Sequence, residues 1–198
     1  MALVRTVCVY CGSGFGKNPA FKEAAQMLGT ALAQAGMSLV YGGGDVGLMG
    51  TVARAVLESG GHVTGIIPDF LQARENMLDA VDETIVVPDM HTRKRLMFER
   101  SDAFVTLPGG IGTLEELVEQ LTWAQLGRHR KPVVLVSVDD FWAPLLGLFD
   151  HMRDHGFIRD GLDLSYLVAK DAAAVVPLLQ AAGHEPDGRA EELVVTKM

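Results

Sequence analysis

The sequence has few cysteines, no long apolar run and too few basic residues to balance its acidic ones, and each shortage excludes a class of protein. Its 198 residues include 17 Lys and Arg against 25 Asp and Glu, which gives a formal net charge of −8. That balance argues against nucleic acid or an anionic membrane as the main partner, because both select a basic surface. A small anionic ligand remains compatible with it, since a glycine loop can hold such a ligand locally.

The remaining shortages concern membranes and redox chemistry. No apolar run reaches the roughly 18 residues that span a bilayer. The apolar N-terminus is interrupted by Arg5, and no small-residue cleavage site follows, so we expect a first strand and not a signal peptide. The two cysteines, Cys8 and Cys11, have C-x-x-C spacing, but a redox dithiol would need both at the start of a helix. We therefore expect inert thiols and a cytoplasmic location.

Short β-rich runs alternate with helical patterns along the chain. We expect strands at 4–10, 37–41, 62–68, 83–88, 102–107, 132–138 and 166–169, and helices near 19–35, 47–59, 89–100, 113–127, 141–155 and 171–182. This order predicts an α/β fold, a doubly wound parallel sheet with helices on both faces. We expect one domain over residues 1–182, followed by a surface tail at 183–198.

Ligands of doubly wound sheets bind at the carboxyl ends of the strands, so the loops after the strands are the informative segments. The loop after 4–10, CGSGFGKN, resembles a Walker A motif only superficially. Cys11 stands where that motif needs glycine, and Asn18 stands where it needs serine or threonine. An ATPase is therefore not predicted.

The loop after 37–41, YGGGDVGLMG, has G-x-G-x-x-G spacing through Gly42, Gly44 and Gly47. At a strand-to-helix junction this spacing is typical of dinucleotide sites, although glycines also serve tight turns. Asp69, after the next strand, could hold a ribose hydroxyl. An NAD(P)-dependent oxidoreductase therefore stays an alternative.

The segment VTLPGGIGTLEE, residues 105–116, has the composition of a phosphate site. Its glycines let backbone N–H groups approach an anion, and a helix N-terminus adds partial positive charge. Glu116 has two readings at this point. It could complete a T-x-x-E capping box with Thr113, or it could act on a ligand. Two glycine loops in one small domain favour a mononucleotide ligand.

The segment DMHTRKR, residues 89–95, brings three successive cations to the same edge of the predicted sheet. Asp89 is expected to cap a helix, which places Arg93 about one turn into it. Arg93 could then reach a ligand held by the glycine loops. Arg95 is expected to belong to the solvated face.

Three motifs together resemble the LOG ("Lonely Guy") family of cytokinin riboside 5′-monophosphate phosphoribohydrolases, some of which were once labelled possible lysine decarboxylases. They are M-x-x-R-K (Met90, Arg93 and Lys94), P-G-G-x-G-T-x-x-E (residues 108–116) and YGGG-x-x-GLMG. The resemblance extends over about residues 4–180. It implies a Rossmann-like subunit that forms a homodimer and binds a nucleoside 5′-monophosphate such as AMP. The enzyme would hydrolyse the N-glycosidic bond, releasing free adenine or cytokinin base and ribose 5-phosphate.

The resemblance also implies the site residues. Arg93 and Glu116 match the pair regarded as catalytic. The matched substrate-binding positions are Glu75, Met90, Lys94, Gly109, Gly110, Ile111, Gly112, Thr113, Thr122, Gly43 and Gly44. Neither cofactor nor metal is expected, because the six histidines are scattered and nothing around Lys94 resembles a pyridoxal phosphate pocket.

The chemistry explains why carboxylates follow a phosphate loop. Breaking a ribosyl–base bond develops positive charge on the sugar, as in glycoside hydrolysis. We expect Glu116 to stabilise that charge and to orient or deprotonate the attacking water. Arg93 would position either the ribose hydroxyls or Glu116 itself. A non-catalytic nucleotide carrier or sensor is the alternative, because fold alone never fixes function.

Overall fold

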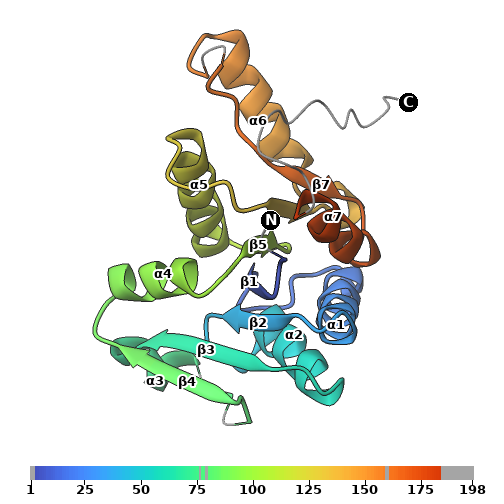
Figure 1. The fold of residues 1–198 in the computed structure, drawn as a ribbon, viewed down its shortest axis with the longest axis vertical. Helices are drawn as coiled ribbons and strands as arrows, with labels where there is room; N and C mark the ends of the chain where they lie inside the picture. The colour runs from blue at the N-terminus through green and yellow to red at the C-terminus, as the bar shows by residue number, and fades with distance from the viewer. Residues whose placement is uncertain (1–2, 76, 79, 159–160, 184–198) are drawn as a thin grey trace.

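The computed structural model describes residues 3–75, 77–78, 80–158 and 161–183. Seven parallel strands form one sheet in the order β4-β3-β2-β1-β5-β6-β7 (Figure 1). The strands are β1 (Thr6–Tyr10), β2 (Ser38–Tyr41), β3 (Val63–Pro68), β4 (Glu83–Val87), β5 (Ala103–Thr106), β6 (Val133–Val136) and β7 (Leu167–Ala169). The predicted α/β doubly wound parallel sheet is therefore confirmed.

Helices connect the strands and cover both faces of the sheet. They are α1 (Pro19–Gln34), α2 (Gly47–Glu58), α3 (Asp69–Glu75), α4 (Met90–Glu99), α5 (Ile111–Gln125), α6 (Ala143–Asp154) and α7 (Val175–Ala182), with 3₁₀ turns at Val138–Asp140 and Ala172–Ala174. One buried core packs α1, α2 and α7 on the sheet, and a second packs α4, α5 and α6 on its other face (Figure 1). No helix among the described residues is long and apolar enough to cross a membrane.

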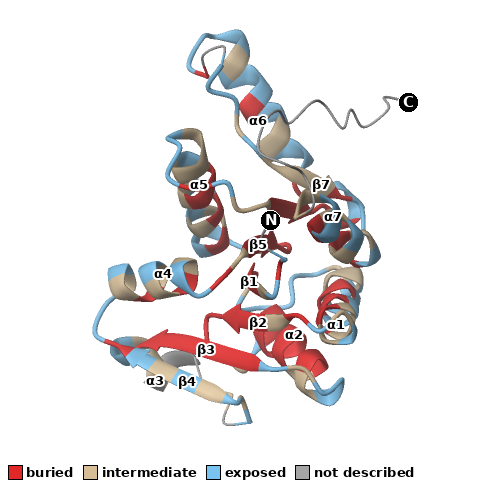
Figure 2. Ribbon diagram, viewed as in Figure 1, coloured by how far each residue is buried: buried red, intermediate tan, exposed pale blue. Residues whose placement is uncertain are grey.

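Burial follows the position of each strand in the sheet. The inner strands β3, β5 and β6 are buried along their whole length, which explains their continuous apolar sequences (Figure 2). The edge strand β4 alternates between intermediate and exposed residues until Val87. Successive side chains point to opposite faces of a sheet, so this alternation means that one face of β4 is more exposed than the other.

Local sequence signals account for most helix starts. Asn18 caps α1 by accepting a hydrogen bond from the Ala20 N–H at 3.0 Å, and Pro19 occupies the first helical position. Asp89 caps α4 by accepting a hydrogen bond from the Thr92 N–H at 2.7 Å, as predicted. This bond is the main reason that the pKa of Asp89 is lowered.

The N-terminus of α5 differs from the prediction in a way that matters for function. The helix begins at Ile111, and its N-cap is Gly110, which has no side chain to bond the first turn. The predicted capping box of Thr113 and Glu116 is therefore wrong, because Thr113 already lies inside the helix. Glu116 therefore does not serve as part of a helix cap.

Two other segments depart from the predicted elements. Helix α3 was not predicted, because seven residues between two strands carry too little periodicity to signal a helix. The helix predicted at 171–182 is divided into the 3₁₀ turn at Ala172–Ala174 and α7. Residues 184–198 of the predicted tail lie outside the described residues.

The strand order reverses between β1 and β5, and this reversal positions the site. Strands β1 to β4 proceed outward on one side, and β5 returns to pair with the other side of β1. The loops after the two strands touch, since the Gly12 N–H donates to the Pro108 carbonyl at 3.1 Å. The Gly12 carbonyl in turn accepts a hydrogen bond from the Leu48 N–H at 3.1 Å. Three strand-end loops therefore meet at the carboxyl edge of the sheet, where ligands of such folds bind.

Candidate active site

The loop after β5 presents backbone N–H groups at the start of α5. Gly110 has open space where a side chain would stand, while Ile111 is 82% exposed. The first N–H groups of a helix have no partner within it, so those of residues 111–113 can bind an anion. A Cβ on Gly109 would lie 2.1 Å from the Thr113 hydroxyl oxygen. Glycine is therefore required there for the loop to fold back on its own helix.

Arg93 enters the crevice from α4 and is almost completely buried. Its guanidinium lies against the backbone of the loop after β2, because a Cβ on Gly42 would be 2.2 Å from Nη2. Its Nη1 is 3.8 Å from the Met90 sulfur. The glycine that follows β2 thus makes room for a cation, and this brings two of the predicted motifs into contact.

Arg93 and Glu116 form a buried ion pair. Arg93 Nη2 lies 3.7 Å from Glu116 Oε1, and the two side chains are 8% and 12% exposed. That separation is an electrostatic contact and exceeds a normal hydrogen bond. Glu116 is on the same helix as the N–H groups of residues 111–113, about one turn further along.

Lys94, the next residue of α4, makes different contacts. Its ammonium donates to Glu115 Oε1 at 2.6 Å and to Glu119 Oε1 at 3.0 Å, and both carboxylates belong to α5. Desolvation lowers the pKa of Lys94, but the two carboxylates outweigh it, so the pKa is raised. Lys94 therefore stays charged and links α4 to α5.

Of the other predicted binding residues, Gly43 and Gly44 lie close to this arrangement. Both are buried in the loop that contacts Arg93, and Gly43 has φ +84°, a conformation that glycine adopts without strain. Gly44 forms an isolated antiparallel bridge with Met77. The loop is thus fixed from two sides.

One predicted residue, Thr122, lies away from the phosphate loop, and the side chain of another, Glu75, is not among those described. Thr122 is exposed on α5, nine residues beyond Thr113 and therefore about 13 Å along the helix, and its hydroxyl donates to the Val118 carbonyl at 2.7 Å. Glu75 is the last residue of α3, and its side chain lies outside the description.

The sequence did not predict a role for the loop after β1. Rejecting it as a Walker motif left it without a role, yet it touches both other loops, and a Cβ on Gly47 would be 2.3 Å from Ser13. Its end is anchored where Asn18 Nδ2 donates to Asp139 Oδ2 at 2.6 Å. Asp139 and Asp140 both have positive φ, 47° and 57°. The available signal was position, because this loop follows the strand at the switch point.

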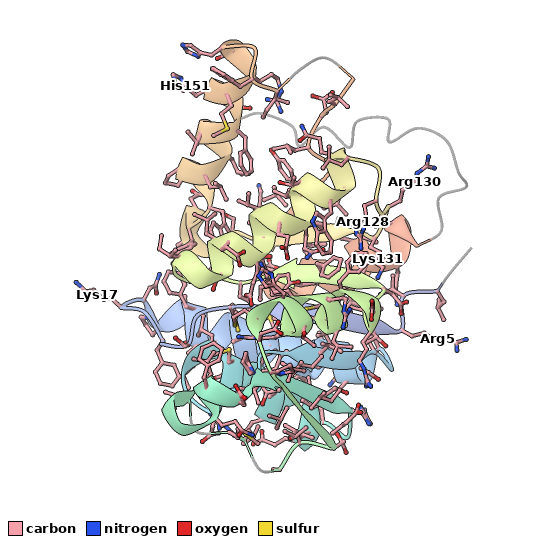
Figure 3. The ribbon with its side chains drawn as sticks, turned by 90° about the vertical axis from the view of Figure 1, so that its left-hand side faces the viewer. Arg5, Lys17, Arg128, Arg130, Lys131 and His151 are labelled. Carbon is pink, nitrogen blue, oxygen red and sulfur yellow. The ribbon has the colours of Figure 1, made fainter. Side chains whose placement is uncertain are left out.

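Most labelled cations lie away from the crevice. Figure 3 places Lys17, which follows β1, at one end of the molecule and Arg5, which precedes β1, at the opposite end. Arg128, Arg130 and Lys131 gather at the end of Arg5.

The cysteines have the surroundings expected of inert thiols. Cys8 and Cys11 are buried and free, and burial is the main reason that the pKa of each thiol is raised. A protonated thiol is a poor nucleophile. Within the described residues, no group of three or more His, Cys, Asp or Glu side chains is placed to hold a metal ion.

Sequence comparisons connect this geometry to known proteins. Residues 49–179 match the family described as "possible lysine decarboxylase". A cytokinin riboside 5′-monophosphate phosphoribohydrolase of Arabidopsis thaliana is 46% identical over 190 residues, which are 96% of this chain and 88% of that protein. The phosphoribohydrolase LOG of Oryza sativa subsp. japonica is 47% identical over 176 residues, which are 89% of this chain and 73% of that protein.

Solved structures support the fold. The molybdenum cofactor binding protein of Rippkaea orientalis superposes with a TM-score of 0.69 at 25% identity, covering 90% of this chain and 96% of that one. The Moco carrier protein of Chlamydomonas reinhardtii gives a TM-score of 0.67 at 23% identity, covering 90% and 97%. The doubly wound sheet thus occurs both in a molybdenum cofactor binding protein and in a Moco carrier protein.

Proposed function

This chain belongs to the LOG family, whose sequence pattern is described as "possible lysine decarboxylase", and from that membership we propose its reaction. It hydrolyses the N-glycosidic bond of adenosine 5′-monophosphates, including N6-substituted ones, and releases the free base and ribose 5-phosphate. Identity of 46–47% to named phosphoribohydrolases over most of the chain supports this assignment.

One structural observation carries the proposal: the buried pair of Arg93 and Glu116 beside uncapped helix N–H groups. A nucleotide has an anion at its 5′ end and develops a cation at its anomeric carbon during hydrolysis. The N–H groups of residues 111–113 bind the phosphate, and the Glu116 carboxylate faces the ribose. Opposite charges are thus each met by the group that stabilises them.

The bond changes follow from this placement. The bond between C1′ and the base nitrogen breaks, and its electron pair leaves with the base. A water oxygen forms the new bond to C1′ while Glu116 orients the water and accepts its proton. The base nitrogen takes up a proton from the solvent, Glu116 later returns the water's proton to the solvent, and ribose 5-phosphate remains. Arg93 places a positive charge 3.7 Å from the Glu116 carboxylate and so balances its charge.

The test is incubation of the purified protein with AMP and with N6-prenyl-AMP, followed by chromatography for free base. Release of adenine or prenyladenine together with equimolar ribose 5-phosphate is the expected result. Binding of either nucleotide with no release of base would instead identify a non-catalytic carrier or sensor, because the same fold can serve either role.

The two remaining activities have less support. A decarboxylase would form a Schiff base with pyridoxal phosphate, which requires a lysine with a lowered pKa. Lys94 is held between two carboxylates that raise its pKa. An NAD(P)-dependent oxidoreductase would use the loop after β2 for the cofactor pyrophosphate, but Arg93 and Gly42 are already in contact there.

We also propose a homodimer that buries the outer stripe of α5. Ile111, Val118 and Leu126 are exposed apolar residues at helical spacing on this stripe, and Thr122 lies between the last two. A contact between Thr122 and the nucleotide would then be made in the second subunit's site. Light scattering at the mass of a dimer supports this arrangement, and a monomer under all conditions contradicts it.

We further propose that the chain is a single nucleotide-binding domain and that it works in the cytoplasm. One continuous sheet with its covering helices supports the first proposal. Two buried thiols that remain unpaired support the second, because a reducing compartment keeps cysteines in that form.

A further inference from the structure

Lys94 is enclosed by carboxylates on α5, not directed at an anion. Its side chain is 11% exposed and bonds to Glu115 and Glu119, which lie four residues apart on one face of the helix. Glu119 is 21% exposed and Glu115 is 52% exposed. The more protected half of this contact is therefore the bond between Lys94 and Glu119.

The charges around Lys94 make it a poor phosphate ligand. One ammonium between two carboxylates leaves a net negative group, and it would repel the nucleotide phosphate. The proposed phosphate ligands are instead the N–H groups of residues 111–113, at the start of the same helix. The second oxygen of Glu119 is buried, with no hydrogen-bond partner among the described residues. Compensation of this buried charge therefore depends on Lys94.

The position of Lys94 gives it control over the adjacent ion pair. Arg93 and Glu116 are 3.7 Å apart, too far for a strong hydrogen bond to fix their spacing. Arg93 is the sequence neighbour of Lys94, and Glu116 is the sequence neighbour of Glu115. The spacing of the pair thus follows the spacing of α4 and α5, which Lys94 bonds together directly.

On the basis of the proposed hydrolysis, we propose that Lys94 is a positioning residue and that the Glu115–Lys94–Glu119 clamp sets the geometry of Arg93 and Glu116. The clamp acts on the rate of bond cleavage and not on nucleotide binding. This assigns Lys94 a role different from the ligand contact that family resemblance implies. It also gives Glu119 a role that no motif suggests.

The discriminating measurement is kcat against KM for the Lys94→Met variant. We expect kcat to fall by about 10²-fold, the scale of a misplacement near 1 Å. The KM for the nucleotide and the inhibition constant of ribose 5-phosphate should stay within about threefold, since a phosphate contact would be worth far more. Lys94→Arg should recover most of kcat because it restores a cation to both carboxylates.

The pH profile supplies a readout that a purely structural role would not move. Without Lys94, the carboxylates of Glu115 and Glu119, which flank Glu116 in the sequence of α5, lose the cation that balances them. The acidic limb of kcat should therefore shift to higher pH in Lys94→Met. Arg100→Met is the matched control, since it removes a cation from an exposed ion pair with Glu83 at the other end of α4. Its kcat and pH profile should match those of the wild type.

A second variant keeps the test decisive if Lys94→Met fails to fold. The Lys94→Met/Glu119→Met double variant replaces the ion pair between Lys94 and Glu119 by an apolar contact. If the Lys94→Met variant folds, the double variant should be more active than it is. If the Lys94→Met variant does not fold, the double variant should fold and show a reduced kcat with an unchanged KM. If the Lys94 variants instead showed a higher KM and a higher ribose 5-phosphate inhibition constant with an unchanged kcat, the positioning role of Lys94 would be contradicted, while the proposed function would stand. Wild-type protein that releases no base would overturn the proposed function, and the clamp with it.

Discussion

Replacing Glu116 by glutamine tests the electrostatic reasoning most directly, because the side chain keeps its shape and loses its charge. At the 3.7 Å that separates Glu116 from Arg93, two unit charges interact by about 4 kcal/mol with an effective dielectric constant near 20. An oxocarbenium-like sugar at a similar distance carries only part of a charge. The carboxylate is then worth about 2–4 kcal/mol to the transition state, or roughly 30- to 10³-fold in rate.

The assay is release of free base from AMP or N6-prenyl-AMP, followed by chromatography over a range of substrate concentrations. We expect Glu116→Gln to lower kcat by that factor while KM changes little, because the charge develops only in the transition state. Arg93 would remain buried without its anion, so the thermal midpoint should also fall.

The control separates chemistry from stability. Glu58→Gln makes the same substitution at the exposed end of α2 and should leave both kcat and the thermal midpoint unchanged. If Glu116→Gln, still folded at the assay temperature, kept its turnover within about threefold of the wild type, roughly 0.65 kcal/mol, the carboxylate would have no part in bond cleavage.

Three further predictions concern stability. Gly29→Ala should lower the free energy of unfolding by about 1–3 kcal/mol, because the new Cβ would lie 2.5 Å from the α2 backbone. Gly147→Ala, at a position with open space around the added Cβ, should raise the free energy of unfolding by about 0.5–1 kcal/mol in the same denaturant titration. Gln120→Met should stabilise the protein by about 1 kcal/mol, because neither polar atom of this buried amide has a partner among the described residues; a lower urea midpoint would refute this. Burial lowers the pKa of His129, and its Nδ1 accepts a hydrogen bond from the Lys131 N–H. The stabilising contribution of His129 should therefore be complete above about pH 6.5 and decline as the pH falls below that value. The thermal midpoint of His129→Gln should accordingly depend less steeply on pH over that range than the midpoint of the wild type.

The predicted elements succeeded wherever one residue type dominates a local conformation. Asp89 and Pro19 mark the starts of α4 and α1, and the buried strands read as continuous apolar runs. The start of α5 was misplaced because threonine is a stronger capping signal than glycine, yet Gly110 caps the helix. The local preference was overridden because the loop must fold over the crevice.

The candidate site shows the same division. Motif spacing located Arg93 and Glu116, and the structure places them 3.7 Å apart. The motif spacing did not reveal that Lys94, the residue after Arg93, bonds to Glu115 and Glu119. Which face of α4 meets which face of α5 depends on the packing of both helices on the sheet, and neither helix carries that information alone.

The sequence by itself determined the order of strands and helices, the glycine-rich loops after β2 and β5, and the motif positions of Arg93 and Glu116. These are properties of short segments, set by side-chain volume, backbone freedom and spacing. Only the tertiary structure decided that the loops after β1, β2 and β5 meet, that Gly42 makes room for Arg93, and that Lys94 serves two carboxylates. Such contacts join residues far apart in the chain, and their distances are fixed by the packing of the helices on the sheet.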